Sequence, residues 1–308
     1  MIAYRKIISI SLILLINLTF SSISNAKNKA SDEPLLVIAS LPPYASLVKD
    51  IGGSAVMVSE VLKINSDPHF FEITPSIIKI FKKAHLFLAS GQAYEATIIN
   101  KLKGLNDKLV IVHLNDISSP IKNDDNSSND KSNKPKHKHK QQHKLDFDVH
   151  TWFSPVILKE QANMIYLKLV DLMPSKKEQL SNNYQQVIGE ISTIHDQLTQ
   201  KLAPYKGKTI FSYHVVTAYF GRDFGLISYG LAPFHVEPSF TDIIKITKAM
   251  KKDKANYILI TSDSQKGRAG IIAKETNARL IRAHEFRSTW QDTILNLSDK
   301  IVEGFTEK

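Results

Sequence analysis

The feature that most restricts the fold is one apolar stripe between Pro174 and Pro204. Its residues recur at intervals of three and four, which is the spacing of one face of an α-helix: they are Leu180, Tyr184, Val187, Ile191, Ile194, Leu198 and Leu202. Proline does not fit inside a helix, so the two prolines predict a helix over residues 175–203. At a rise of about 1.5 Å per residue this helix spans roughly 42 Å, which is longer than a small domain needs. We expect it to connect two lobes.

Short apolar runs of strand length alternate with helical stretches on both sides of this helix. The runs lie at 34–40, 55–62, 85–90 and 109–114, and then at 208–214, 256–262 and 278–284. The first run ends at "LPPY", which predicts a turn, and Thr74-Pro75 has the pattern of a helix N-cap and first helical residue. Strands separated by helices indicate parallel βαβ units. The predicted fold is α/β, with two lobes of mostly parallel sheet, residues 27–174 and 204–308, joined by the long helix.

The first 26 residues have the pattern of a secretory signal peptide. Arg5 and Lys6 precede an apolar stretch from Ile7 to Phe20, and Ser24-Asn25-Ala26 has the small-x-small form of a cleavage site. The stretch is short for a membrane anchor, and no cysteine follows it that could carry a lipid. We predict residues 1–26 to be a signal peptide and the mature protein to lie in the periplasm.

Composition narrows the chemistry further. The chain has no cysteine, so disulfides and thiolate ligands are excluded and any metal must sit on His, Asp or Glu. Of the formal net charge of +10, residues 121–145 supply seven Lys against three Asp. Residues 117–146 contain almost nothing apolar, so we expect a mobile loop there. A nucleic-acid-binding protein would spread its basic residues over a face with interleaved aromatics, and we predict no nucleic-acid partner.

Three histidines stand where a predicted strand or loop passes into the next element: His69 in "SDPHFFEITPS", His150 in "FDVHTWFSP" and His214 in "FSYHVVTAYF". The first two follow an aspartate in a D-x-H pattern, and a carboxylate near a ligating imidazole fixes its tautomer. Each histidine alone reads as a polar loop residue. Because the two lobes both contribute, the three together are candidates for a metal site in the cleft between the lobes.

An ordered set of motifs resembles the zinc-binding component of high-affinity zinc ABC uptake systems, within the zinc/manganese solute-binding protein family. These motifs are "SLPPYASLVKDIGG", "SDPHFFEITPS", "AHLFLASGQAYE", "DVHTWFSP", "LAPYKGKTIFSYHVVTAYFGRDFGL", "EPSFTDI" and "IAKETNARL". The resemblance implies two α/β lobes bridged by a helix, with His69, His150 and His214 as metal ligands. It also implies that the protein is no enzyme: as a monomer, it would carry Zn²⁺ as transported ligand to a membrane permease.

At the fourth ligand position the sequence departs from these relatives, which commonly place an Asp after the last strand. Here the stretch reads "LIRAHEFRSTWQD", and His284 aligns with that Asp. Glu285 next to it, or water, could occupy the position instead. The predicted metal ligands are therefore His69, His150, His214 and His284, with the fourth open among these three alternatives.

Imidazole at the position of His214 suits Zn²⁺, whereas manganese-binding relatives usually place Glu there. A manganese-binding relative is the alternative within the family. From other classes, a secreted zinc-dependent hydrolase lacks support because no H-E-x-x-H or G-x-S-x-G motif occurs, and a metal-buffering or adhesion protein stays open. His137, His139 and His143 alternate with lysines that repel a divalent ion, so they form either a weak accessory site or an inert loop.

Overall fold

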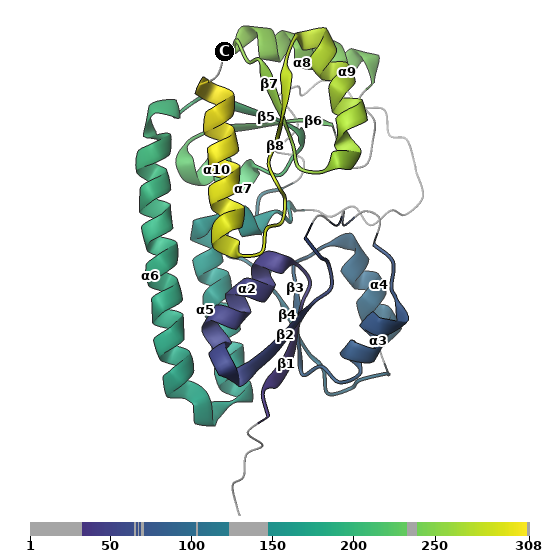
Figure 1. The fold of residues 1–308 in the computed structure, drawn as a ribbon, viewed down its shortest axis with the longest axis vertical. Helices are drawn as coiled ribbons and strands as arrows, with labels where there is room; N and C mark the ends of the chain where they lie inside the picture. The colour runs from purple at the N-terminus through teal and green to yellow at the C-terminus, as the bar shows by residue number, and fades with distance from the viewer. Residues whose placement is uncertain are drawn as a thin grey trace, which may run out of the picture. The chain divides into compact units, whose positions relative to one another are not determined.

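Two four-stranded sheets, each entirely parallel, form the framework of the fold (Figure 1). The computed structural model describes residues 33–64, 66, 68, 71–102, 104–122, 147–232 and 239–306. Residues 35–308 belong to one compact unit. The predicted signal peptide lies outside the described residues. The predicted α/β class, with two lobes of parallel sheet and one long helix, is confirmed.

The first lobe has the strand order β2-β1-β3-β4. Its strands are β1 (Leu35–Ala39), β2 (Val56–Glu60), β3 (Leu86–Ala89) and β4 (Val110–His113), and its helices are α2 (Pro42–Gly52), α3 (Pro75–Phe81), α4 (Ala93–Leu102) and α5 (Pro155–Leu172). Thr74 caps α3 as predicted, because its side chain accepts a hydrogen bond from the backbone N–H of Ile77. The predicted turn at "LPPY" is instead the start of α2, with proline in the first helical turn, where its missing N–H costs nothing.

The second lobe repeats this topology with the order β6-β5-β7-β8. Its strands are β5 (Thr209–His214), β6 (Ile227–Ala232), β7 (Tyr257–Ile260) and β8 (Arg279–Arg282), and its helices are α7 (Ala218–Phe224), α8 (Phe240–Lys252), α9 (Lys266–Thr276) and α10 (Trp290–Thr306). Sequence patterns did not predict β6, which contains Gly230. A Cβ atom at Gly230 would lie 1.8 Å from Cγ2 of Val215, the residue that follows β5. The close packing of Val215 against this strand therefore requires glycine at position 230.

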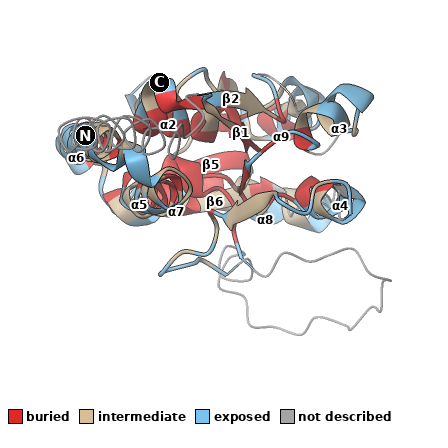
Figure 2. Ribbon diagram, turned by 90° about the horizontal axis from the view of Figure 1, so that it is seen from below, coloured by how far each residue is buried: buried red, intermediate tan, exposed pale blue. Residues whose placement is uncertain are grey.

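The long helix α6 (Lys177–Leu202) packs against both lobes, through α2 and α5 on one side and α7 and α10 on the other. Six of the seven stripe residues are buried, and the seventh, Tyr184, stacks on Tyr166 at 4.5 Å between ring centroids. One hydrophobic core continues from the first sheet through α6 to the second sheet. Figure 2 shows the buried strands in red between helices whose outer faces are exposed. The lobes are therefore held together by apolar packing as well as by the helix.

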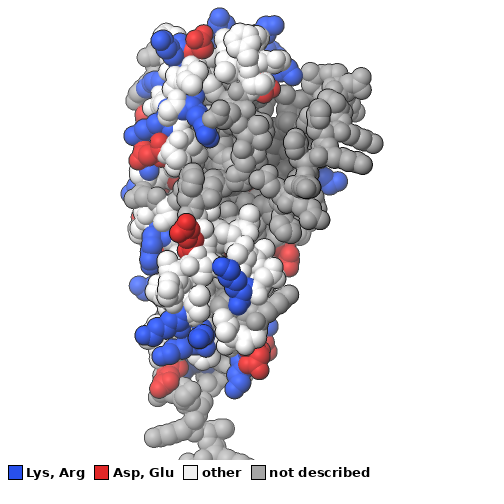
Figure 3. Space-filling view, turned by 90° about the vertical axis from the view of Figure 1, so that its right-hand side faces the viewer, with Lys and Arg blue, Asp and Glu red and all other residues white. Residues whose placement is uncertain are grey.

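Two further properties describe the surface and the helices: the distribution of charge and the hydropathy. On the face drawn in Figure 3, the described Lys and Arg side chains alternate with Asp, Glu and uncharged residues and form no continuous basic band. Over the residues that the structure describes, no helix has the length and apolar character needed to cross a membrane.

Candidate metal centre

Two of the predicted ligands, one from each lobe, lie side by side. His214 is the last residue of β5, and His150 precedes a short 3-10 turn, Thr151–Phe153, that leads into α5. The centroids of the two imidazole rings are 5.0 Å apart and the rings are inclined at 76°. His150 is almost fully buried, with 2% of its surface exposed. The carboxyl end of a parallel strand is where α/β proteins place ligand-binding groups, and here it supplies His214.

The carboxylate of Asp148 orients the ring of His150. Its Oδ1 accepts the backbone N–H of His150 at 2.8 Å and lies 2.6 Å from Nδ1 of the same residue. With the proton on Nδ1, the lone pair is on Nε2, which is the form that ligates a metal. Burial lowers the pKa of His150, but the charge and hydrogen bond of Asp148, together with the charge of Glu285, raise it more, so that the net shift is upward.

A buried polar network holds the residue that follows His150. The hydroxyls of Tyr44 and Thr151 are 2.8 Å apart, and Nε2 of Gln161 lies 3.0 Å and 2.9 Å from them. The same nitrogen donates to the carbonyl of Leu114 at 2.8 Å. Burial raises the pKa of Tyr44 above its ordinary value, so its hydroxyl keeps its proton. The network joins α2, α5 and the end of β4 to the segment that carries the imidazole.

The structure distinguishes the two neighbouring residues at the fourth position. The charge of Glu285 acts on His150, and Oε2 of Glu285 accepts a hydrogen bond from the Thr261 hydroxyl at 3.3 Å. The pKa of His284 is lowered, first by burial and then by the charges of Arg282, Arg287 and Lys300. Its backbone N–H donates to Oδ1 of Asn296 at 3.0 Å. Of the two side chains, Glu285 is thus the one that interacts with His150, and His284 as a ligand stays a prediction.

The remaining predicted ligand, His69, lies outside the described residues, as do His137, His139, His143 and His235. Among the described residues, no three His, Asp or Glu side chains are close enough together to hold a metal ion. His85 has a structural role, because its Nδ1 accepts the backbone N–H of Leu36 at 3.0 Å. The described part of the centre thus consists of a pair of imidazoles, one of which contacts the carboxylate of Asp148.

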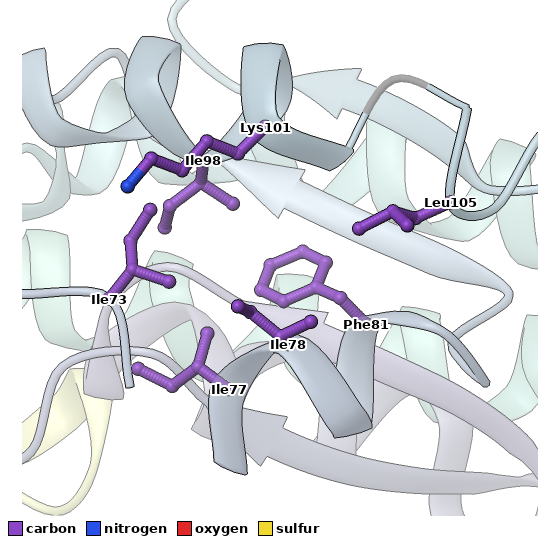
Figure 4. A pocket seen from close by; sticks show the side chains of 7 residues that line it. All are labelled: Ile73, Ile77, Ile78, Phe81, Ile98, Lys101 and Leu105. Atoms are coloured by element: carbon purple, nitrogen blue, oxygen red, sulfur yellow. The ribbon is translucent and has the colours of Figure 1, made fainter. Parts of the chain in front are cut away.

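A pocket between α3 and α4 is unsuited to a metal ion (Figure 4). Its lining includes one charged side chain, Lys101, and otherwise consists of Ile73, Ile77, Ile78, Phe81, Ile98 and Leu105. An ammonium group has no lone pair to donate to a cation. The pocket therefore does not compete with the imidazole pair as the metal centre.

Residues 117–122, at the start of the predicted mobile loop, make hydrogen bonds to the rest of the fold. The Ser118 backbone N–H donates to Glu160 at 2.7 Å, and Lys122 forms an antiparallel bridge with Phe147. The rest of that loop, residues 123–146, lies outside the described residues.

Two parallel α/β lobes that share a long helix, and that each bring an imidazole to their junction, are the arrangement expected of a metal-binding solute-binding protein. A family model described as "Zinc-uptake complex component A periplasmic" matches residues 37–304, and the chain belongs to this family.

Individual relatives agree with the family match. The chain is 22% identical over 255 residues to the "High-affinity zinc uptake system protein ZnuA" of Yersinia pestis, which covers 79% of this chain and 80% of the relative. A crystal structure of a ZnuA deletion mutant with zinc bound superposes with a TM-score of 0.77 at 22% identity, over 90% of this chain and all of the other. A manganese-bound periplasmic metal binding protein from Candidatus Liberibacter asiaticus gives a TM-score of 0.73 at 20% identity, over 87% and 98% of the two chains. The fold alone therefore does not select the metal.

Proposed function

We propose that this protein captures Zn²⁺ with His69, His150, His214 and a fourth group, and delivers the ion to the membrane permease of an ABC transporter. It acts in the periplasm as a monomer. The observation that carries the proposal is the pair of imidazoles, one from each lobe, at 5.0 Å between ring centroids, with Nδ1 of one ring held by a carboxylate. Membership of the family makes the protein a solute-binding component of zinc uptake and not an enzyme.

The ligand chemistry favours zinc over manganese. Zn²⁺ prefers nitrogen ligands and a four-coordinate tetrahedral site, whereas Mn²⁺ prefers oxygen ligands. His214 supplies nitrogen at the position where manganese-binding relatives usually carry Glu. A site with four protein ligands also has no open position for a nucleophilic water, which weighs against the hydrolase alternative.

A competitive titration of the metal-stripped mature protein tests the proposal. A chromophoric chelator of known zinc affinity reports how much zinc the protein withdraws, and the expected result is one tight site per chain. Added Mn²⁺ should leave most of the zinc bound, because Mn²⁺ is the weakest divalent first-row ion for nitrogen ligands. Absence of a tight zinc site, or displacement of zinc by equimolar Mn²⁺, would contradict the proposal.

Zinc affinity is expected to fall on acidification, and to begin falling above pH 6.5. A protonated imidazole has no lone pair for zinc, and the net pKa shift of His150 is upward, so protons compete at a higher pH than at an ordinary histidine, whose pKa is about 6.5. In the metal-free protein the same shift stabilises the fold fully below the unfolded pKa, and this stabilisation is lost as the pH rises through the folded pKa. The affinity should be measured from about pH 8.5 to about pH 5.5.

Asp148→Asn is the matched variant for this measurement. It keeps the size of the side chain but removes the negative charge that raises the pKa of His150, so the midpoint of zinc loss should move to lower pH. An unmoved midpoint would show that another group controls the pH dependence.

A further inference from the structure

Helix α7 of the second lobe contacts the chain just before His150. The side chain of Tyr219, on the first turn of α7, is fully buried. Its hydroxyl accepts a hydrogen bond from the backbone N–H of Ile121 at 3.1 Å and donates one to the backbone carbonyl of Asp148 at 2.8 Å. Asp148 is the residue whose carboxylate holds the ring of His150. The hydroxyl of Tyr219, in the second lobe, therefore holds the backbone of Asp148, which in turn orients His150, the predicted ligand of the first lobe.

Ile121 and Asp148 also bond to each other. The N–H of Asp148 donates to the carbonyl of Ile121 at 2.8 Å, and the neighbouring residues Lys122 and Phe147 form an antiparallel bridge. We call residues 119–122 and 147–148 the stem. Every polar backbone group of Asp148 is thus engaged, one by the opposite side of the stem and the other by Tyr219.

Two further residues of α7 hold the same region. Arg222 donates from Nη1 to the carbonyl of Ser119 at 2.8 Å, and its guanidinium lies 5.1 Å from the centre of the Tyr219 ring. Asp223 accepts a hydrogen bond from the hydroxyl of Ser154, which in turn caps α5 by accepting the N–H of Ile157 at 3.1 Å. Helix α7 therefore binds the chain both before and after His150.

Helix α7 also lies close in the sequence to His214, the predicted ligand of the second lobe. The helix begins four residues after His214, the last residue of β5. The element that holds the chain around His150 is consequently tied, through a short connection, to the other imidazole. Resting on the proposed zinc site, we infer that Tyr219 is a positioning residue that sets His150 relative to His214 through the backbone and carboxylate of Asp148.

The hydroxyl of Tyr219 keeps its proton at any pH at which the protein works. Burial raises its pKa to about 12. The bond to the Asp148 carbonyl therefore persists across the range in which the histidines titrate, and acidification does not release the stem.

A purely structural role is the competing explanation, because a buried tyrosine stabilises most folds. Tyr257 provides a matched control in the same lobe: it is also buried, and its hydroxyl donates to the backbone carbonyl of Thr209 at 3.2 Å. The two tyrosines differ in the residue whose carbonyl they bind. Tyr219 binds the carbonyl of Asp148, which contacts His150, whereas Tyr257 binds that of Thr209, at the opposite end of β5 from His214.

The test compares Tyr219→Phe with Tyr257→Phe in the mature, zinc-loaded protein. Zinc release into an excess of chelator is followed by stopped flow, and unfolding of the metal-free proteins by urea. We expect Tyr219→Phe to release zinc about tenfold faster, the lower end of the range for residues that orient a ligand, and Tyr257→Phe to stay within about twofold of the parent. Both variants should unfold at lower urea concentration than the parent.

A double-mutant cycle with Asp148→Ala, which removes the side chain that holds the ring of His150, tests the route. If Tyr219 acts through the side chain of Asp148, adding Tyr219→Phe to Asp148→Ala should change the release rate by less than about twofold. Equal release rates for the two tyrosine variants, or full additivity in the cycle, would overturn the inference. Should Tyr219→Phe fail to fold, Arg222→Ala carries the same test, with an expected acceleration of about threefold and no acceleration as the contrary result. A parent protein that binds no zinc would instead refute the proposed function, so the two failures are distinguishable.

Discussion

Replacing His150 with alanine is expected to lower the zinc affinity of the protein by about a hundredfold or more. Four-ligand zinc sites bind with about 10–16 kcal/mol, so one ligand contributes about 3 kcal/mol on average. At about 1.4 kcal/mol for each factor of ten, this corresponds to about two decades in Kd. The loss is increased because the buried carboxylate of Asp148 would lose its imidazole partner.

His214→Ala should have an effect of the same size, because its ring is the nearest described imidazole to that of His150. Both variants should be measured by chelator competition beside His195→Ala, whose ring lies on α6 and contacts Asp196 and Phe224. The control should bind zinc as the parent does. If the zinc affinity fell by less than about tenfold in either variant, the imidazole pair would not be the centre of the metal site.

Glu285→Gln is expected to weaken zinc binding by about tenfold to a hundredfold, whereas His284→Ala should change it by less than about threefold. The reason is the difference between the surroundings of these adjacent residues. The charge of Glu285 acts on His150, so its carboxylate would neutralise part of the charge of a zinc ion bound by that imidazole. His284 instead has three cations, Arg282, Arg287 and Lys300, against the single carboxylate of Asp263, and this balance opposes the approach of a divalent ion.

The measurement is the same competitive titration, with the number of zinc ions per chain determined for each variant. A strong effect of His284→Ala with a weak effect of Glu285→Gln would restore the set of four histidines that the sequence predicts. Small effects of both would assign the fourth position to water.

Much of the fold could be predicted because its signals are local. The stripe from Leu180 to Leu202 has a single period, since one face of α6 meets apolar groups of both lobes along its length. Strand β6 escaped prediction because Gly230 interrupts it, and the need for glycine there comes from Val215, which no local pattern reveals. Helix α2 escaped because its two initial prolines resemble a turn, although the first turn of a helix tolerates them.

Some residues of the candidate site could likewise be predicted from local sequence patterns, and others could not. The position of His214 at a strand end and the D-x-H pattern at His150 could be read from the sequence. The choice between His284 and Glu285 could not, because both lie in the loop that follows β8, where no periodic pattern says which side chain faces the junction. Tyr219 gave no signal at all, since its partner Asp148 is 71 residues away.

The bridge between Lys122 and Phe147 also has a practical consequence for engineering. It places Lys122 and Phe147, the described residues on either side of 123–146, next to each other. Closing a longer loop costs only about 0.6 kcal/mol for each doubling of its length, and such points accept inserted domains. Because Asp148 follows Phe147 directly, a fluorescent protein exchanged for residues 123–146 would sit two residues from a group that contacts His150. We therefore expect a fluorophore inserted at this position to respond to zinc capture.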